Sequence, residues 1–287
     1  MEPILQVENL TKQYPGFTLD HISFSVPRGT IVGLIGENGA GKSTTLKAIL
    51  DLIRKDDGTV CLFGQELTED RKDIKEDIGV VFDGIHFHET LTPKKVEKIS
   101  EAAYKQWDPQ VYQSYLRQFA LPAEKEIKTF SKGMKMKLSI AVALSHDPKL
   151  LILDEATSGL DPVMRDDILD VFMDFVQDES HSILMSSHIT TDLEKIADYI
   201  TFIHKGKIIF DKSKDELIYD YGIIRCNSSQ FEKLDKEDIL ACRKRDYQWD
   251  VLVANKEKAA RKYKDYVIDH AAIDDILLLY VKGDVLS

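Results

Sequence analysis

The sequence predicts an α/β fold: a largely parallel sheet with helices on its faces, an inserted helical subdomain and a small C-terminal α+β appendix. An apolar run at 31–35 leads through a glycine-rich loop into a helical pattern at 42–53. After Pro148, short apolar runs alternate with helical patterns, as in parallel strands joined by helical crossovers. Between these two parts, residues 83–148 show mostly helical periodicity, which predicts the inserted subdomain.

The elements can be placed along the chain from these patterns. Residues 4–10 and 19–26 alternate apolar and polar side chains, and Tyr14-Pro15-Gly16 marks a turn between two strands. In the helical subdomain we expect helices at 94–105, 110–119 and 132–145. The alternation after Pro148 predicts strands at 150–153, 182–186 and 199–204, with helices at 165–177 and 191–197.

A third region begins near Leu217 and predicts the C-terminal appendix. We expect strands at 222–226 and 247–253, the second with Tyr247, Trp249, Val251 and Val253 on one side. Asn255 can cap a helix at 256–266, and Gly283 can close a helix at 272–282. A regulatory ligand site and a pad that stabilises a dimer are both open as its function.

Composition excludes several classes of protein. The chain has 287 residues, of which 43% are hydrophobic and 30% charged, as in ordinary globular proteins. We expect no membrane span, because the apolar runs are far shorter than the roughly 20 residues needed, and no signal peptide at residues 1–10. The net charge of −11 disfavours nucleic acid as a partner. Three scattered cysteines, Cys61, Cys226 and Cys242, are typical of unpaired thiols in the cytoplasm.

A phosphate-binding loop is the strongest motif. Its pattern, GxxxxGK[ST], requires glycines because backbone N–H groups must turn inward around phosphate oxygens. The loop directly follows a predicted strand and leads into a predicted helix, as a P-loop NTPase core requires. The N-terminus of that helix adds a partial positive charge. Lys42 can reach the outer phosphates, and the Ser43 hydroxyl can face Mg²⁺. The predicted ATP-binding residues of this loop are Gly36, Glu37, Asn38, Gly39, Ala40, Gly41, Lys42, Ser43 and Thr44.

Two adjacent acids follow the apolar run at 150–153. A strand this apolar is expected inside a parallel sheet, and its carboxyl end is where ligands bind in α/β folds. Asp154 is therefore a candidate metal-binding residue beside the phosphate loop. Glu155 is placed to polarise an attacking water as a general base. These residue types predict hydrolysis of Mg-ATP.

From 4 to 217 the chain resembles the nucleotide-binding subunit of ATP-binding-cassette transporters. The resemblance is carried by motifs in the family's order: the phosphate loop, Ser131-Lys132-Gly133-Met134-Lys135 at the signature, Asp154–Asp161 running into the D-loop, and Ser186-Ser187-His188 at the switch histidine. It implies that Ser131, Lys132 and Gly133 face the γ-phosphate of ATP bound to a second subunit. It also implies that His188 contacts that phosphate, that Asp161 is the D-loop acid, and that Tyr14 stacks on adenine, with Phe17 as the alternative.

Two positions depart from the family's usual pattern. Asp83 stands where the family usually has a glutamine that contacts the metal and water, and it remains a candidate metal-binding residue. The signature has Lys132 and Met134 where glycine and glutamine are usual. Both departures resemble the branch of the family that exports drugs, antibiotics and peptides.

The resemblance implies a complete functional assignment, with 1–82 and 149–217 as nucleotide-binding core, 83–148 as signature subdomain and 218–287 as accessory domain. Its cofactors would be ATP and Mg²⁺. Its partners would be a separate transmembrane permease at the cytoplasmic face of the membrane, and a second copy or a paralogous ATPase as a head-to-tail dimer. A candidate permease-docking groove lies beside 83–91, with Ile85, Phe87 and Phe119 as apolar contacts or as core. An importer ATPase, and a soluble ATPase acting on ribosomes or DNA, are the alternatives.

Overall fold

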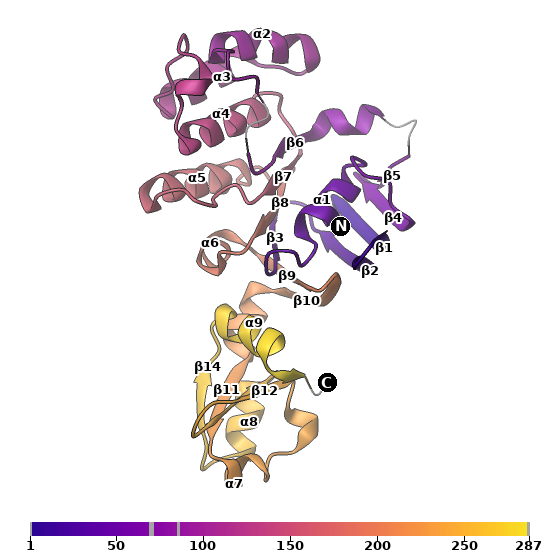
Figure 1. Ribbon diagram of the computed structural model, residues 1–287, viewed down its shortest axis with the longest axis vertical. Coiled ribbons are helices and arrows are strands. Elements are labelled where there is room, and N and C mark those ends of the chain that lie inside the picture. The colour runs from indigo at the N-terminus through magenta and orange to yellow at the C-terminus, as the bar shows by residue number, and fades with distance from the viewer. Residues whose placement is uncertain (1, 69–71, 85–86, 286–287) are drawn as a thin grey trace.

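The computed structural model describes residues 2–68, 72–84 and 87–285. Three regions lie along its long axis (Figure 1): a group of helices at one end, two sheets in the middle and a third sheet with its own helices at the other end. The phosphate loop and the two acids lie in the middle region, so the central sheet is the element that positions the site.

The central sheet has six strands in the order β10-β9-β3-β8-β7-β6. All neighbours from β9 to β6 are parallel, and β10 adds an antiparallel edge. Both faces are covered, which explains why β3 and β7 consist of buried residues throughout. The bounds are Ile31–Ile35 for β3, Ile78–Val81 for β6, Leu150–Asp154 for β7, Ser182–Ser187 for β8, Tyr199–His204 for β9 and Lys207–Ser213 for β10.

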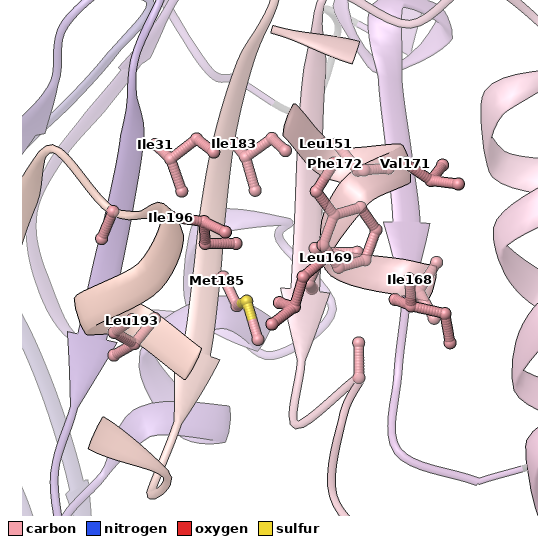
Figure 2. Packing of buried hydrophobic residues seen from close by; sticks show 14 of the residues in the cluster. Ile31, Leu151, Ile168, Leu169, Val171, Phe172, Ile183, Met185, Leu193 and Ile196 are labelled. Atoms are coloured by element: carbon pink, nitrogen blue, oxygen red, sulfur yellow. The ribbon is translucent and has the colours of Figure 1, made fainter. Parts of the chain in front are cut away.

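Alternate residues of this sheet belong to two different cores. Ile31, Leu151 and Ile183 pack with Phe172 and the helices of one face, as Figure 2 shows. Their neighbours Val32, Ile152 and Leu184 pack on the other face, where α1 (Lys42–Ile49) and a second sheet lie. The helices of the first face are α4 (Lys132–Leu144), α5 (Pro162–Phe175) and α6 (Thr190–Ile196).

The second sheet is antiparallel, in the order β2-β1-β4-β5. The two strands predicted at 4–10 and 19–26 are β1 (Leu5–Tyr14) and β2 (Phe17–Val26), joined by the turn at Pro15-Gly16. The sequence did not predict β4 (Asp57–Leu62) and β5 (Gln65–Glu66). Asp57 and Gly58 open β4, and both residue types are depleted in strands, which hid it.

The helical subdomain contains α2 (Pro93–Ala103), α3 (Pro109–Gln118) and α4, close to the predicted helices. Both α2 and α3 begin with an N-cap followed by proline: the Thr92 side chain accepts a hydrogen bond from the N–H of Lys95, and Asp108 accepts two from the first turn of α3. Two of the three suggested docking residues are better explained as core. Phe119 is buried and Phe87 packs against the same cluster, while Ile85 lies outside the described residues.

The C-terminal region has a βαββαβ order of elements with strand order β14-β11-β13-β12, extended at one edge by β15. This is the arrangement of a ferredoxin-like α+β unit. The sequence did not predict β12 and β14, and the helix that it predicted at 256–266 runs past the end of the observed helix at Lys262. The bounds are Gly222–Cys226 for β11, Ser228–Phe231 for α7, Ala241–Lys244 for β12, Trp249–Val253 for β13, Lys256–Lys262 for α8, Val267–His270 for β14, Ile273–Lys282 for α9 and Asp284–Val285 for β15.

Helix α9 joins this unit to the rest of the molecule. Val251 and Val253 point into a small core beneath α7 and α8. Leu252, between them, belongs instead to the large core, together with Ile276 of α9. On its far side α9 places the Tyr280 ring 5.8 Å from that of Phe210 in β10 and 6.4 Å from that of Phe202 in β9. The appendix therefore shares a hydrophobic core with the central sheet.

Short turns connect these elements. The turns are 3-10 helices at Lys72–Asp77, Ile127–Thr129 and Lys236–Asp238 and a π-helical turn at Glu216–Asp220. Within the described part of the chain, no helix has the length and apolar character to cross a bilayer. All three cysteines are free, and burial raises the pKa of the Cys226 thiol to about 11.

Candidate ATP-binding and hydrolysis site

A cavity of about 540 Å³ lies at the carboxyl ends of β3, β7 and β6. The loop after β3 forms its floor, with Gly39 and Gly41 at φ values of 82° and 118°. Only glycine adopts such values readily, and they turn successive N–H groups toward the cavity. The cavity is lined by Phe17, Glu37, Asn38, Gly39, Gly41, Lys42, Ser43, Thr44, Asp83, Asp154 and Glu155.

Lys42 is the cation of this cavity. Its side chain is only 5% exposed, and its ammonium donates to the carbonyl oxygens of Gly36, at 2.7 Å, and Glu37, at 3.3 Å. The same ammonium lies 3.1 Å from Oε1 of Glu155. A buried lysine is stable here because three oxygen atoms surround its charge. It is thereby held ready to exchange a carboxylate oxygen for a phosphate oxygen.

Asp154 is the second fixed group of the site. It is 5% exposed at the end of β7 and accepts hydrogen bonds at Oδ1 from the hydroxyls of Ser43, at 3.0 Å, and Ser186, at 2.6 Å. The donor set is therefore hydroxyl and carboxylate oxygen, which Mg²⁺ prefers. These oxygens fit such an ion, whereas among the described residues no group of three or more His, Cys, Asp or Glu side chains could hold a metal.

Glu155 has an uncommon backbone conformation, with φ at 52°. Its N–H donates to Ser186 in the neighbouring strand β8, which holds it there. The side chain is 13% exposed, with one carboxylate oxygen beside Lys42 and the other accepting a 2.6 Å hydrogen bond from Nδ1 of His188. The predicted base, phosphate lysine and switch histidine thus form one connected group.

His188 completes this group from the loop after β8. Since β8 lies between β3 and β7, the phosphate loop, the acids and the histidine come from three adjacent parallel strands. The sequence predicted these side chains separately. It missed the role of Ser186, whose hydroxyl and carbonyl fix both Asp154 and the backbone of Glu155.

Comparisons with known proteins agree with this geometry. A family model described as ABC transporter matches residues 19–158. The bacitracin transport ATP-binding protein BcrA of Enterococcus faecalis is 36% identical over 220 residues, covering 76% of this chain and 71% of that protein. The chain belongs to the ATP-binding proteins of ABC transporters. Proteins of this family bind and hydrolyse ATP to drive transport.

Two further relatives extend the comparison. The lantibiotic transport ATP-binding protein SrtF of Streptococcus pyogenes is 35% identical over 215 residues, covering 74% of this chain and 92% of that protein. A solved structure of an ATP-binding subunit of an ABC transporter has a TM-score of 0.68 at 30% identity and covers 75% of this chain and 91% of that one. The α/β fold with a P-loop core is therefore confirmed.

The ABC signature residues lie at the start of α4. The Ser131 hydroxyl accepts a hydrogen bond from the N–H of Met134 at 3.2 Å, so in this structure it caps the helix. Gly133 faces α5 so closely that a Cβ would overlap Met164. A side chain at this position would force the end of the Met164 side chain to move.

Asp161 and Tyr14, both carried over from the family, have local contacts. Asp161 caps α5 by accepting a hydrogen bond from the N–H of Met164 at 3.0 Å. Tyr14 is 41% exposed with the Lys12 ammonium 5.4 Å from its ring, and it does not line the cavity. Phe17 does line it. The geometry therefore favours Phe17 over Tyr14 as the aromatic that stacks on adenine.

Proposed function

We propose that this ABC subunit hydrolyses Mg-ATP at the interface with a second ATPase subunit and thereby drives a separate permease that exports amphipathic peptide antibiotics. The observation that carries the proposal is the Lys42–Glu155–His188 group at the edge of a glycine-floored cavity, with Ser43 and Asp154 paired beside it. Buried charge concentrated in this way at one edge of a sheet is typical of a functional site.

ATP hydrolysis begins with an exchange of contacts at Lys42. Lys42 moves its ammonium from Glu155 to the outer phosphates of ATP, which frees one oxygen of the carboxylate. Glu155 then accepts a proton from the attacking water, while His188 donates a hydrogen bond to the γ-phosphate. Ser43 and Asp154 would hold Mg²⁺, which would supply positive charge to the phosphates. Lys42, His188 and the loop N–H groups stabilise the charge that develops in the transition state.

The second subunit supplies the lid. The start of α4 is exposed at Ser131 and Lys132, and its N-terminus offers backbone N–H groups and a partial positive charge. We place these residues, with Gly133, against ATP bound to the other subunit, and Asp161 at the contact between subunits. Binding free energy shared by both subunits would then be lost on hydrolysis, which opens the dimer.

The transported compound is proposed from the named relatives. BcrA is named for bacitracin transport and SrtF for lantibiotic transport, and both compounds are peptide antibiotics. The acidic residue at 83 and the lysine at 132 also match the exporter branch. We therefore place this subunit at the cytoplasmic face of the membrane, bound to a permease that carries amphipathic peptides outward.

Dimer formation provides the direct test. In a Glu155→Gln background, which slows hydrolysis, Mg-ATP should double the molar mass measured by light scattering. Adding Ser131→Arg should prevent this increase, because an arginine at the helix N-terminus fills the space intended for a phosphate. Lys128→Arg, on an exposed turn, is the matched control and should dimerise normally. A dimer unaffected by Ser131→Arg would exclude the sandwich arrangement.

Export is tested separately in cells. The subunit expressed with the membrane protein that co-purifies with it should raise the concentration of a peptide antibiotic that inhibits growth, and Lys42→Ala should remove that protection. Co-purification with ribosomes in place of a membrane protein would contradict the proposal.

A further inference from the structure

Two charged residues stand where the ABC family usually has uncharged ones, and the structure places them together. Asp83 follows β6 by two positions, and Lys132 is the first residue of α4. They are 49 positions apart in the sequence, yet Nζ of Lys132 lies 3.6 Å from Oδ1 of Asp83. The side chains are equally half-exposed, at 52% each. The two departures therefore have opposite charge and are in contact.

Lys132 also lies close to a third segment. A Cβ placed on Gly159 would lie 3.1 Å from its Nζ and 3.8 Å from its Cδ and Cε. Gly159 belongs to the segment between Glu155 and the start of α5, which leads into the D-loop. One ammonium thus lies between the loop after β6, the signature helix and the D-loop segment of the same subunit.

The position of Lys132 is electrostatically unfavourable without a partner. The first turn of α4 has no acidic residue, and a cation at a helix N-terminus opposes the helix dipole. Asp83 supplies the missing negative charge from outside the helix. A neutral residue at 83 would remove the ion pair that Lys132 makes among the described residues.

Lys132 also offsets the negative charge of the residues that line the cavity. Four acids, at 37, 83, 154 and 155, line it, and Lys42 is the single Lys or Arg among the described residues that do. A triphosphate adds several further negative charges, so a carboxylate at 83 opposes its binding. Lys132 brings a second positive charge to this rim and offsets the carboxylate.

We propose that Asp83 and Lys132 form one charge-compensated positioning pair, which links the helical subdomain to the rim of the nucleotide cavity. The proposal rests on the proposed function, because it requires ATP to bind in this cavity. Exposed ion pairs are weak, so the pair can open when the subunits close. Opening releases Lys132 toward the phosphate held by the other subunit, and it couples nucleotide binding to movement of α4.

A double-mutant cycle tests the pair. Asp83→Asn and Lys132→Met should each lower kcat about five-fold or more, because each leaves one charge without its partner. The two changes should move KM in opposite directions: Asp83→Asn lowers KM for ATP and Lys132→Met raises it. The double variant should have a higher kcat than either single variant, because neither charge is then left without its partner. Independent residues would instead give a double variant slower than either single one, which would overturn the proposal.

Two matched variants separate the pair from effects on folding. Lys132→Arg keeps the charge and should keep kcat near the wild-type value. Lys137→Met removes another ion pair of α4, with Asp167 at 3.2 Å, and should leave kcat and KM unchanged. All variants should unfold at nearly the wild-type temperature. Loss of kcat in Lys132→Arg, or an equal loss in Lys137→Met, would overturn the proposal.

The proposed function can fail independently of the pair, and a nucleotide titration distinguishes the two. If Lys42→Ala binds ATP as tightly as the wild type, the cavity is not the nucleotide site and both proposals fall. If Lys42→Ala loses ATP while the cycle is additive, the ATPase assignment stands and the pair alone is wrong.

Discussion

The central sheet and the C-terminal sheet both bury two apolar faces, but only the central one gathers reactive groups at a single edge. Its strands β3, β8, β7 and β6 are adjacent and parallel, so their carboxyl ends carry the phosphate loop, His188, the two acids and Asp83 side by side. In the C-terminal sheet every neighbour is antiparallel, so carboxyl ends alternate between opposite edges. Strand direction, more than residue composition, decides where a site can be assembled.

The acids of the two regions differ accordingly. Asp154 in the core is bound by hydroxyls, which leaves its charge available to a cation. Asp238 in the C-terminal unit is bound by Lys262 at 2.5 Å, Lys258 at 3.4 Å and the Tyr263 hydroxyl. Hydrogen bonding to Lys262 and Tyr263 lowers the pKa of Asp238 to about 2. The first carboxylate is placed for a ligand, and the second is used to hold α8 in place.

The largest expected effect is on hydrolysis. Glu155→Gln should bind ATP but hydrolyse it at least ~100-fold more slowly, because an amide cannot accept the proton of the attacking water. Phosphate release measures this rate. Glu237→Gln, an exposed acid of the C-terminal unit, should hydrolyse ATP normally. Near-normal turnover by Glu155→Gln would remove that residue from the role of base.

The second-largest expected effect is on the affinity for ATP. Lys42→Ala should weaken ATP binding by about 100-fold, because it removes a charge-assisted contact to phosphate and leaves Glu155 without its buried cation. Titration with a fluorescent nucleotide measures the affinity. Lys262→Ala should bind as the wild type does, since its ion pairs lie in the C-terminal unit. Unchanged affinity in Lys42→Ala would contradict the phosphate-loop assignment.

A smaller effect is expected where the two regions meet. Tyr280→Ala removes the ring packed against Phe202 and Phe210 and should destabilise this contact by about 2 kcal/mol, less than for a fully buried ring because Tyr280 is partly exposed. Calorimetry should then resolve two unfolding transitions, the C-terminal unit melting first. Lys282→Ala, exposed on the same helix, should keep a single transition. A single transition in Tyr280→Ala would show that the shared core does not depend on this ring.

The smallest expected effect is a loss of folding stability at low pH. Burial lowers the pKa of His146, whose ring stacks on Tyr104 at a centroid distance of 4.1 Å. The folded state therefore resists protonation, and stability present above the unfolded pKa of about 6.5 is lost as pH falls toward the folded value. At pH 5 the loss is at most about 2 kcal/mol.

A substitution that keeps the stacked ring isolates this contribution. His146→Phe should lose less stability between pH 8 and pH 5 than the wild type, as measured by denaturant midpoints. Equal losses in the two proteins would show that another group causes the acid sensitivity.

The sequence predicted the parts of the core whose signals are local. A fixed motif marks residues 36–43, and an apolar run ending in two acids marks β7, so both were placed correctly. The bond from Nδ1 of His188 to Glu155 and the role of Ser186 were not predictable, because they depend on strand order. Asp83 and Lys132 were both identified, but their contact depends on how α4 packs beside β6.

Prediction was poorer in the C-terminal unit, where strands are short and no motif marks them. Charged residues make up half of β12, and β14 has acidic and histidine side chains at its end, so neither has clear alternation. The predicted helix at 256–266 ran on through Tyr263, because nothing in the sequence signals where α8 ends. Phe17 lines the cavity and Tyr14 does not, and this difference depends on the fold of the hairpin, not on either residue type.

Helix α9 has a practical consequence for work with this protein. Through Tyr280, α9 covers Phe202 and Phe210 of the ATPase core. Removing the chain after Tyr221 to obtain a minimal enzyme would therefore expose these apolar rings to water. Such a fragment should aggregate in solution even though its catalytic loops are intact. Replacing both phenylalanines with polar residues would be needed to make the shortened enzyme tractable.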